Sequence, residues 1–221
     1  MRLRSSHTQA AVALVAAAVI LAATAAAASA ASHGRGWKST RYGRKGAELW
    51  VEFPHLLFAT GAGYREDYDV TEGLGFGLGM MWGISDNIAF EGRMLQTNHT
   101  AGAEDKEWDI DLLKVGARYT FFAEYRFQPF VGTGWAKMSI ERDTGFESED
   151  PFERMTGYGA YVTIGVDYIH SGSWSGFFRA DYTHGGYGHR TIGLEDETLD
   201  EPLSGNSVAV TLGIAYRVPA W

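Results

Sequence analysis

Residues 72–84, EGLGFGLGMMWGI, alternate between large apolar side chains and glycine. The even positions hold Leu74, Phe76, Leu78, Met80, Trp82 and Ile84, and the odd positions from 73 to 83 hold glycine except at Met81. A period of two indicates a β-strand, because successive side chains of a strand point to opposite faces. A phosphate-binding G-x-G loop needs a strand before it and a helix after it. The unbroken alternation favours one strand instead.

The same alternation recurs along the chain and predicts eight strands. In SVAVTLGIAYRV (207–218), valine, leucine, isoleucine and tyrosine share one face, and small or polar residues share the other. The segment around Leu112 and Leu113 keeps its alternation only if it slips by one residue, which predicts a bulge there. The predicted strands are 48–60, 72–84, 88–98, 108–122, 127–140, 156–168, 176–185 and 206–218.

The connections between these segments alternate in length. Short connections fall at 85–87, 123–126 and 169–175, and long, charged ones at 61–71, 99–107, 141–155 and 186–205. Tight turns at one end and long loops at the other are typical of outer-membrane barrels, whereas a soluble sandwich has no reason to segregate them. We therefore predict an all-β fold, an eight-stranded antiparallel transmembrane β-barrel with short periplasmic turns and long outer loops.

Aromatic residues gather near both ends of the predicted strands, as expected at two membrane interfaces. One predicted belt lies near the short turns and comprises Trp82, Tyr119, Phe121, Phe122, Tyr125, Phe127, Phe130, Tyr168, Trp174, Phe177, Phe178 and Tyr216. The other lies near the long loops and comprises Trp108, Tyr158, Tyr182 and Tyr187. A soluble β core would instead concentrate its aromatic residues in mid-strand.

The first 30 residues have the organisation of an export signal. Arg2 and Arg4 precede a long Ala-rich apolar run, and Ala28-Ser29-Ala30 is a small-residue cleavage motif. An uncleaved membrane anchor is the alternative. We divide the chain into a signal peptide (1–30), a basic N-terminal arm (31–47) and a barrel domain (48–221), and we expect the outer membrane of a Gram-negative-type bacterium as the location.

Charge and cysteine content exclude other classes of function. Cleavage at residue 30 leaves 17 of the 19 lysines and arginines against all 27 acids, a charge of −10. Nucleic-acid binding requires basic surfaces, so we expect no nucleic-acid partner. The absence of cysteine rules out disulfides and thiolate chemistry. We expect a monomer that contacts outer-membrane lipid and lipopolysaccharide.

Strand parity places charged residues on the inner face, where unpaired charges would be costly. We predict a salt-bridged structural plug between facing strands, with a charged ion pathway as the alternative. The glycines of 73–83 then line the interior and make room for larger inward groups such as Trp135 and Tyr161. The predicted inner charges are Glu52, Glu91, Arg93, Lys114, Arg118, Lys137, Asp167, Arg179, Asp181 and Arg217.

Three short stretches are similar to a known family. FQPFVGTGWAKMS (127–139) resembles the -PF-G-G- fifth-strand pattern of small eight-stranded outer-membrane barrels, the outer membrane protein A N-terminal domain and outer membrane protein X among them. NIAFEGRM (87–94) and LGIAYRV (212–218) resemble other strands of that family. The resemblance implies a fold, a location and recognition by the barrel-insertion machinery. Barrels of this family usually end on an aromatic residue that is in phase with the alternation of the last strand, but Trp221 is out of phase with Tyr216. Whether the insertion machinery recognises Tyr216 or Trp221 is left open.

The leading functional hypothesis is a non-enzymatic barrel, without catalytic, cofactor or metal sites, that supports envelope integrity or binds through acidic outer loops. Acids cluster in 141–153 and 195–201, but their spacing does not match a calcium-binding loop, so a solvated rim is the simpler interpretation. A lipid A deacylase-like enzyme is one alternative. Its H-x-S pattern is absent, and DYTHGGYGH (181–189) is the nearest candidate. A small porin or ligand channel is another.

Overall fold

The computed structural model describes residues 46–61, 70–101, 106–142, 153–193 and 195–218. These residues form a β-sheet of nine strands. The strands are β1 (Gly46–Ala59), β2 (Val70–Gly83), β3 (Ile88–Ala101), β4 (Lys106–Thr120), β5 (Phe127–Arg142), β6 (Glu153–Ile169), β7 (Trp174–Ile192), β8 (Glu195–Ser204) and β9 (Ser207–Arg217). The predicted signal peptide and nearly all of the basic arm, as well as Trp221, lie outside the described residues. Among the described residues there is no helix with the length and hydropathy needed to cross a bilayer.

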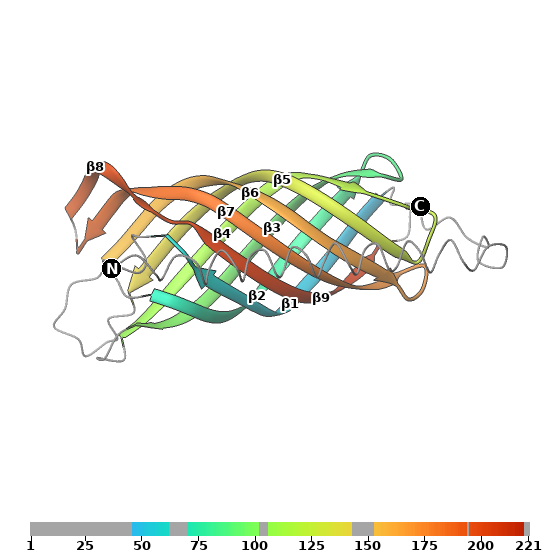
Figure 1. The fold of residues 1–221 in the computed structure, drawn as a ribbon, viewed down its shortest axis with the longest axis horizontal. Coiled ribbons are helices and arrows are strands. Elements are labelled where there is room, and N and C mark those ends of the chain that lie inside the picture. The colour runs from blue at the N-terminus through green and yellow to red at the C-terminus, as the bar shows by residue number, and fades with distance from the viewer. Residues whose placement is uncertain (1–45, 62–69, 102–105, 143–152, 194, 219–221) are drawn as a thin grey trace, which may run out of the picture.

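Eight of the strands close into a ring. Each of β1 to β6 pairs with the strand that follows it in the chain, β7 pairs with β9, and β9 pairs with β1; all of these pairings are antiparallel. Closure leaves no open sheet edge, which satisfies the backbone hydrogen bonds of a structure that spans lipid. Figure 1 shows the strands tilted around a common axis. The predicted eight-stranded antiparallel barrel is confirmed.

The remaining strand of the sheet, β8, lies outside this ring. The first part of β7 pairs with β9, from Trp174 to Thr183, and its last part pairs with β8, from Gly186 to Ile192. The resulting β7–β8 hairpin extends beyond the other strands at the end with the long connections (Figure 1). The sequence pattern predicts a loop over 186–205, because acidic residues replace the apolar alternation there. The chain forms paired strands instead.

Strand irregularities differ from the prediction. The register of β1 shifts between Glu52 and His55 against both of its neighbours, at the position of Pro54, which has no backbone N–H to donate. The predicted bulge in β4 is wrong, since β4 pairs without a register shift on either side. Leu112 is buried inside the barrel while Leu113 is exposed. Apolar residues occur on both faces here, so no slip is required.

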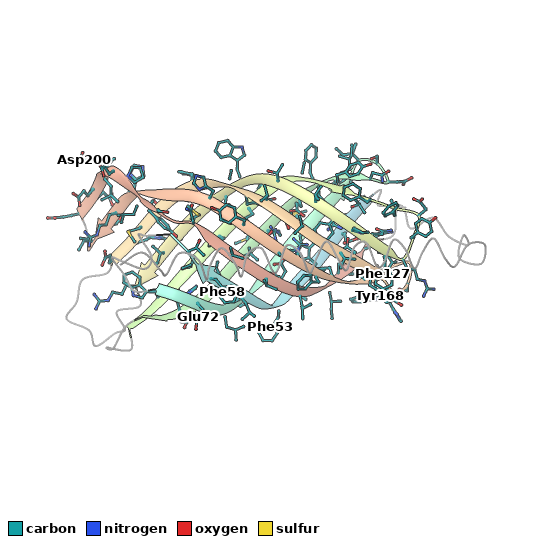
Figure 2. The ribbon with its side chains drawn as sticks, in the orientation of Figure 1. Phe53, Phe58, Glu72, Phe127, Tyr168 and Asp200 are labelled. Atoms are coloured by element: carbon teal, nitrogen blue, oxygen red, sulfur yellow. The ribbon has the colours of Figure 1, made fainter. Side chains whose placement is uncertain are left out.

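The outer surface of the ring is apolar. The side chains of Leu74, Phe76, Leu78, Met80 and Trp82 are all exposed. Figure 2 shows side chains projecting from the outside of the ribbon, with Phe53 pointing away from it. An apolar exposed band around a closed ring is the arrangement that a barrel in lipid requires.

Aromatic residues form a dense belt at the short-turn end, although Phe130 and Phe177, which were predicted to belong to it, are buried inside the barrel. The ring centroids of Phe127 and Tyr168 lie 4.9 Å apart, and those of Trp174 and Tyr216 also lie 4.9 Å apart. Figure 2 shows Phe127 and Tyr168 together at one end of the barrel and Asp200 at the other.

The second belt, at the long-loop end, is smaller than predicted. Tyr158 and Tyr182 are exposed on the outer face, but Trp108 and Tyr187 are buried. Both residues stand at inward-facing positions of their strands. They are therefore inside the barrel, although they lie near the strand ends.

Candidate functional site: the charged interior

Glycines on the inner face make room for large side chains on neighbouring strands. A Cβ atom added at Gly79 would overlap the ring of Trp50, and one at Gly213 would overlap the ring of Phe177. A Cβ at Gly116 would collide with the hydroxyl of Tyr161. The prediction that Trp135 fills this space is wrong, because its side chain is 70% exposed on the outer face. Tyr161 is buried inside, as expected from its parity.

Eight charged side chains lie buried in the middle and the short-turn part of the interior, and we call them the charged belt. The structure gives each of them a relative exposure of 4% or less. Among the described residues of the belt, four acids balance four bases, so it carries no net formal charge. Its members are Glu52 on β1, Glu91 and Arg93 on β3, Lys114 and Arg118 on β4, Asp167 on β6, and Arg179 and Asp181 on β7.

Arg93 is the centre of the larger part of this belt. Its two terminal nitrogens donate to both carboxylate oxygens of Asp181, at 3.0 and 2.8 Å. Its guanidinium also lies 3.8 Å from the carboxylate oxygens of Glu52 and of Glu91. Lys114 Nζ approaches the same Asp181 at 3.7 Å. A bidentate pair at full burial fixes the relative position of β3 and β7, which are not neighbours in the ring.

Arg179 and Tyr161 connect this part to the surrounding rings. The guanidinium of Arg179 lies 3.4 Å from Glu52 and 3.9 Å from Glu91, and its carbon lies 4.5 Å from the ring centroid of Phe177. The Tyr161 hydroxyl donates to Glu91 at 3.1 Å. These contacts pair opposite charges and place cations over aromatic faces, which offsets part of the cost of removing them from water.

Arg118 and Asp167 form a second buried ion pair, nearer the short turns. The guanidinium carbon of Arg118 lies 3.6 Å from the ring centroid of Phe130, so the cation also stacks on an aromatic face. This pair joins β4 to β6 across the interior.

Two of the predicted inner charges are not part of the charged belt. Arg217 has the inward parity predicted for it, but it lies at the short-turn rim, where its guanidinium approaches Glu48 at 3.5 Å. Lys137 is exposed, so its predicted inward position is wrong. On β5 the interior receives the even positions, such as Phe130, Ala136 and Met138, and Lys137 therefore shares the outer face with Trp135. The orientation of Lys137 therefore follows from the alternation along the whole of β5 and not from its own charge.

Toward the long loops from the charged belt, the interior is filled mainly by apolar side chains that we call the apolar cap. The polar side chains of Thr97, His99, Thr183 and Ser207 are also buried at this end. The apolar cap joins residues of β1 and β3 to β7, with Leu203 of β8 packed against it. Its buried members are Leu57, Ala59, Leu95, Trp108, Ile110, Leu112, Ala136, Met138, Ile140, Met155, Tyr161 and Tyr187. A smaller apolar cluster of Trp50, Met81, Ala89, Phe177 and Ala215 lies on the short-turn side.

The apolar cap was not predicted, although the sequence contains a signal for it. Trp108, Ile110 and Leu112 share the parity of Lys114 and Arg118, which were assigned to the interior. Assuming that every apolar residue faces lipid led to a predicted bulge instead of an apolar interior.

The acidic outer segments lie apart from this interior. Glu195, Asp196, Glu197, Asp200 and Glu201 are exposed on β8, where Thr191 donates to Asp196 at 2.8 Å. The acids between 143 and 150 lie outside the described residues. Within the described ranges, no group of three or more histidine and acidic side chains has the arrangement of a metal site.

The histidines suggested by the enzyme alternative are separate from one another. His184 is exposed on the outer wall and stacks on Tyr182, with ring centroids 6.5 Å apart. The Nδ1 atom of His189 lies 3.4 Å from the hydroxyl of Thr198 in the outer hairpin. His170 and Ser171 lie in the turn after β6, at the opposite end of the barrel, and Ser171 accepts from the backbone N–H of Trp174 at 3.1 Å.

Several solved structures are similar to this fold. The crystal structure of Neisserial surface protein A has a TM-score of 0.58 at 14% identity, covering 79% of this chain and 98% of that one. OprG from Pseudomonas aeruginosa has a TM-score of 0.60 at 14% identity, covering 82% and 100%. Ail of Yersinia pestis has a TM-score of 0.50 at 12% identity, covering 79% and 99%. At these identities the likeness extends to the fold alone.

Sequence comparison gives the family directly. No curated protein sequence matches the chain. Residues 14–217 match the family described as the outer membrane protein beta-barrel domain, which covers most of the chain and all eight strands of the ring. The ring, its apolar outer surface and this match agree, and the chain belongs to the outer membrane protein beta-barrel domain family of Gram-negative bacteria.

Proposed function

We propose that the protein is a closed, non-enzymatic barrel that supports the integrity of the outer membrane and interacts with its surroundings through its outer surface. The observation that supports this best is the filling of the interior by two stacked layers, the charged belt and the apolar cap. A solute moving along the axis would have to displace both layers. An eight-stranded barrel has an interior that side chains fill, so no water-filled channel is expected.

Conductance measurements test whether the barrel is closed. Purified, folded protein inserted into planar bilayers is expected to give no steady current, whereas a large porin in the same bilayers gives ohmic steps. Folding is checked by heat-modifiable gel mobility of the same sample. A steady conductance proportional to the number of inserted barrels would contradict the proposal and favour the small-channel alternative.

The outer hairpin is the part that we propose for binding. It extends beyond the ring, and its acids are exposed on a strand that pairs only with β7 among the described residues. A variant with Glu195→Gln, Asp196→Asn and Glu197→Gln removes three of these charges and keeps the side-chain size. Glu124→Gln, which changes one exposed acid at the short-turn end, is the control.

In the biological assay, each variant is expressed in cells that lack the protein, and the resistance of these cells to detergent is measured. We expect the wild-type chain and the control variant to restore resistance, and the hairpin variant to restore it less well. If the hairpin variant restores resistance fully, the acids are only a solvated rim. The lipid A of the same cells, measured by mass spectrometry, is expected to keep its acyl pattern. A loss of acyl chains that depends on the protein would favour the enzyme alternative.

A further inference from the structure

The outer wall of β5, β6 and β7 presents a group of aromatic and basic side chains that the function proposed above does not use. Lys137 pairs in register with Tyr158, and the row below it runs from Trp135 through Ala160 to His184. Trp135 is 70% exposed and Tyr158 is 62% exposed. We call this set the Lys137 patch; it comprises Trp135, Lys137, Tyr158, Tyr182 and His184.

The patch lies where the outer surface changes from apolar to polar. On β5 the outward residue after Trp135 is Lys137, and on β7 the outward residue after Tyr182 is His184. Leu113, next to Lys137 in register, is followed by Asp111 toward the loops. This change occurs toward the long loops, so it marks the boundary between acyl chains and headgroups in the outer leaflet.

The cation of Lys137 has no acidic partner among the described residues. Arg154, an exposed cation farther up the same wall, is different, because its guanidinium lies 3.5 Å from Glu141. A lysine at this height extends its alkyl stem along the apolar wall and keeps its ammonium group in the headgroup layer. An unpaired ammonium flanked by exposed rings is suited to an anion whose attached groups are apolar or sugar-like.

We propose that the Lys137 patch binds one phosphorylated glycolipid of the outer leaflet, the lipid A part of lipopolysaccharide. The Lys137 ammonium contacts a lipid A phosphate, and Trp135, Tyr158 and Tyr182 pack against its sugar and the first carbons of its acyl chains. His184 extends the polar edge of the same surface. Charge complementarity selects this occupant, because Lys137 presents an ammonium group on the exposed wall beside exposed aromatic rings, and a phosphate is the group of opposite charge at this depth of the outer leaflet.

Native mass spectrometry of the full-length protein tests the site. The protein is reconstituted in phosphatidylcholine nanodiscs that contain hexa-acylated lipid A, dephosphorylated lipid A or phosphatidylglycerol, and retained lipids are counted. The variants are Lys137→Gln, Lys137→Arg and Arg154→Gln; the last removes an outward charge that is already paired. Heat-modifiable mobility verifies that every variant is folded.

We expect the wild type, Lys137→Arg and Arg154→Gln to retain one phosphorylated lipid A. Loss of a charge-assisted contact should weaken retention in Lys137→Gln by about tenfold. The wild type should retain dephosphorylated lipid A and phosphatidylglycerol only weakly. This weak retention should equal that of phosphorylated lipid A by Lys137→Gln. The proposal is overturned if Lys137→Gln retains lipid A like the wild type, if Arg154→Gln loses it equally, or if phosphatidylglycerol binds as tightly as lipid A. None of these outcomes depends on whether the barrel conducts.

Discussion

The charged belt and the apolar cap fill the same tube by different physical means. In the belt, Arg93 and Asp181 form two hydrogen bonds across the interior, and each has further charged neighbours. In the cap, residues such as Leu112 and Met138 are fully buried without any polar partner. A belt residue is specified by its partner, because an unpaired buried charge is costly, whereas a cap residue is specified mainly by its volume.

In this small barrel, different residues therefore fill the interior and hold the strands in alignment. The belt links strands that are not neighbours, such as β4 and β6 through Arg118 and Asp167, and so constrains their relative position. The cap fills much of the outer half of the interior with apolar side chains. Substitutions in the two regions should therefore lower the free energy of unfolding by different amounts. The losses should also differ in their salt dependence and in whether a second substitution can restore stability.

The largest effect is expected from breaking an ion pair of the belt. Asp167→Ala leaves Arg118 without its carboxylate and should lower the free energy of unfolding by about 3–5 kcal/mol. Urea titration in lipid vesicles, followed by tryptophan fluorescence, measures the change. The double variant Arg118→Met/Asp167→Leu, which removes both charges, should lose much less. Equal losses in the single and double variants would show that the pair is not coupled.

A somewhat smaller effect is expected in the cap. Met138→Ala removes a fully buried side chain and should lower the free energy of unfolding by about 2–5 kcal/mol, with no charge left unpaired. The loss should not change with salt concentration. Lys137→Ala, at the adjacent outward position, is the control and should stay within about 0.5 kcal/mol of the wild type. A larger loss at Lys137 than at Met138 would reverse the assigned orientation of β5.

The smallest effect concerns an inward glycine that makes room for Trp50, a member of the smaller apolar cluster on the short-turn side. A Cβ at Gly79 would overlap Trp50, so Gly79→Ala should cost about 1–3 kcal/mol through overpacking. Gly92, on β3, has no atom within 4 Å of an added Cβ, so Gly92→Ala should change stability by about 0.5 kcal/mol or less. The same unfolding titration distinguishes them. Equal costs at both positions would mean that backbone freedom, rather than space for Trp50, selects glycine.

The outer wall was more predictable from sequence than the interior. Residues 74–84 and 208–216 alternate so regularly that the pattern alone assigns their outward faces, since lipid accepts only apolar side chains. The interior accepts both charges and apolar residues. Parity alone therefore could not assign the orientation of Leu112 or Trp108, and it misplaced Lys137. The β7–β8 hairpin was also missed, because two exposed paired strands need no apolar alternation.

Period-two alternation specified the number of strands in the ring, their approximate limits and the lipid-facing surface, because it follows from the geometry of a single strand. The tertiary structure was needed to show which buried charges meet, because that depends on the register between strands distant in sequence. It was also needed to show that Lys137 faces outward and that the outer half of the interior is mainly apolar, because alternation alone does not say which face of a strand turns inward when both faces carry apolar residues.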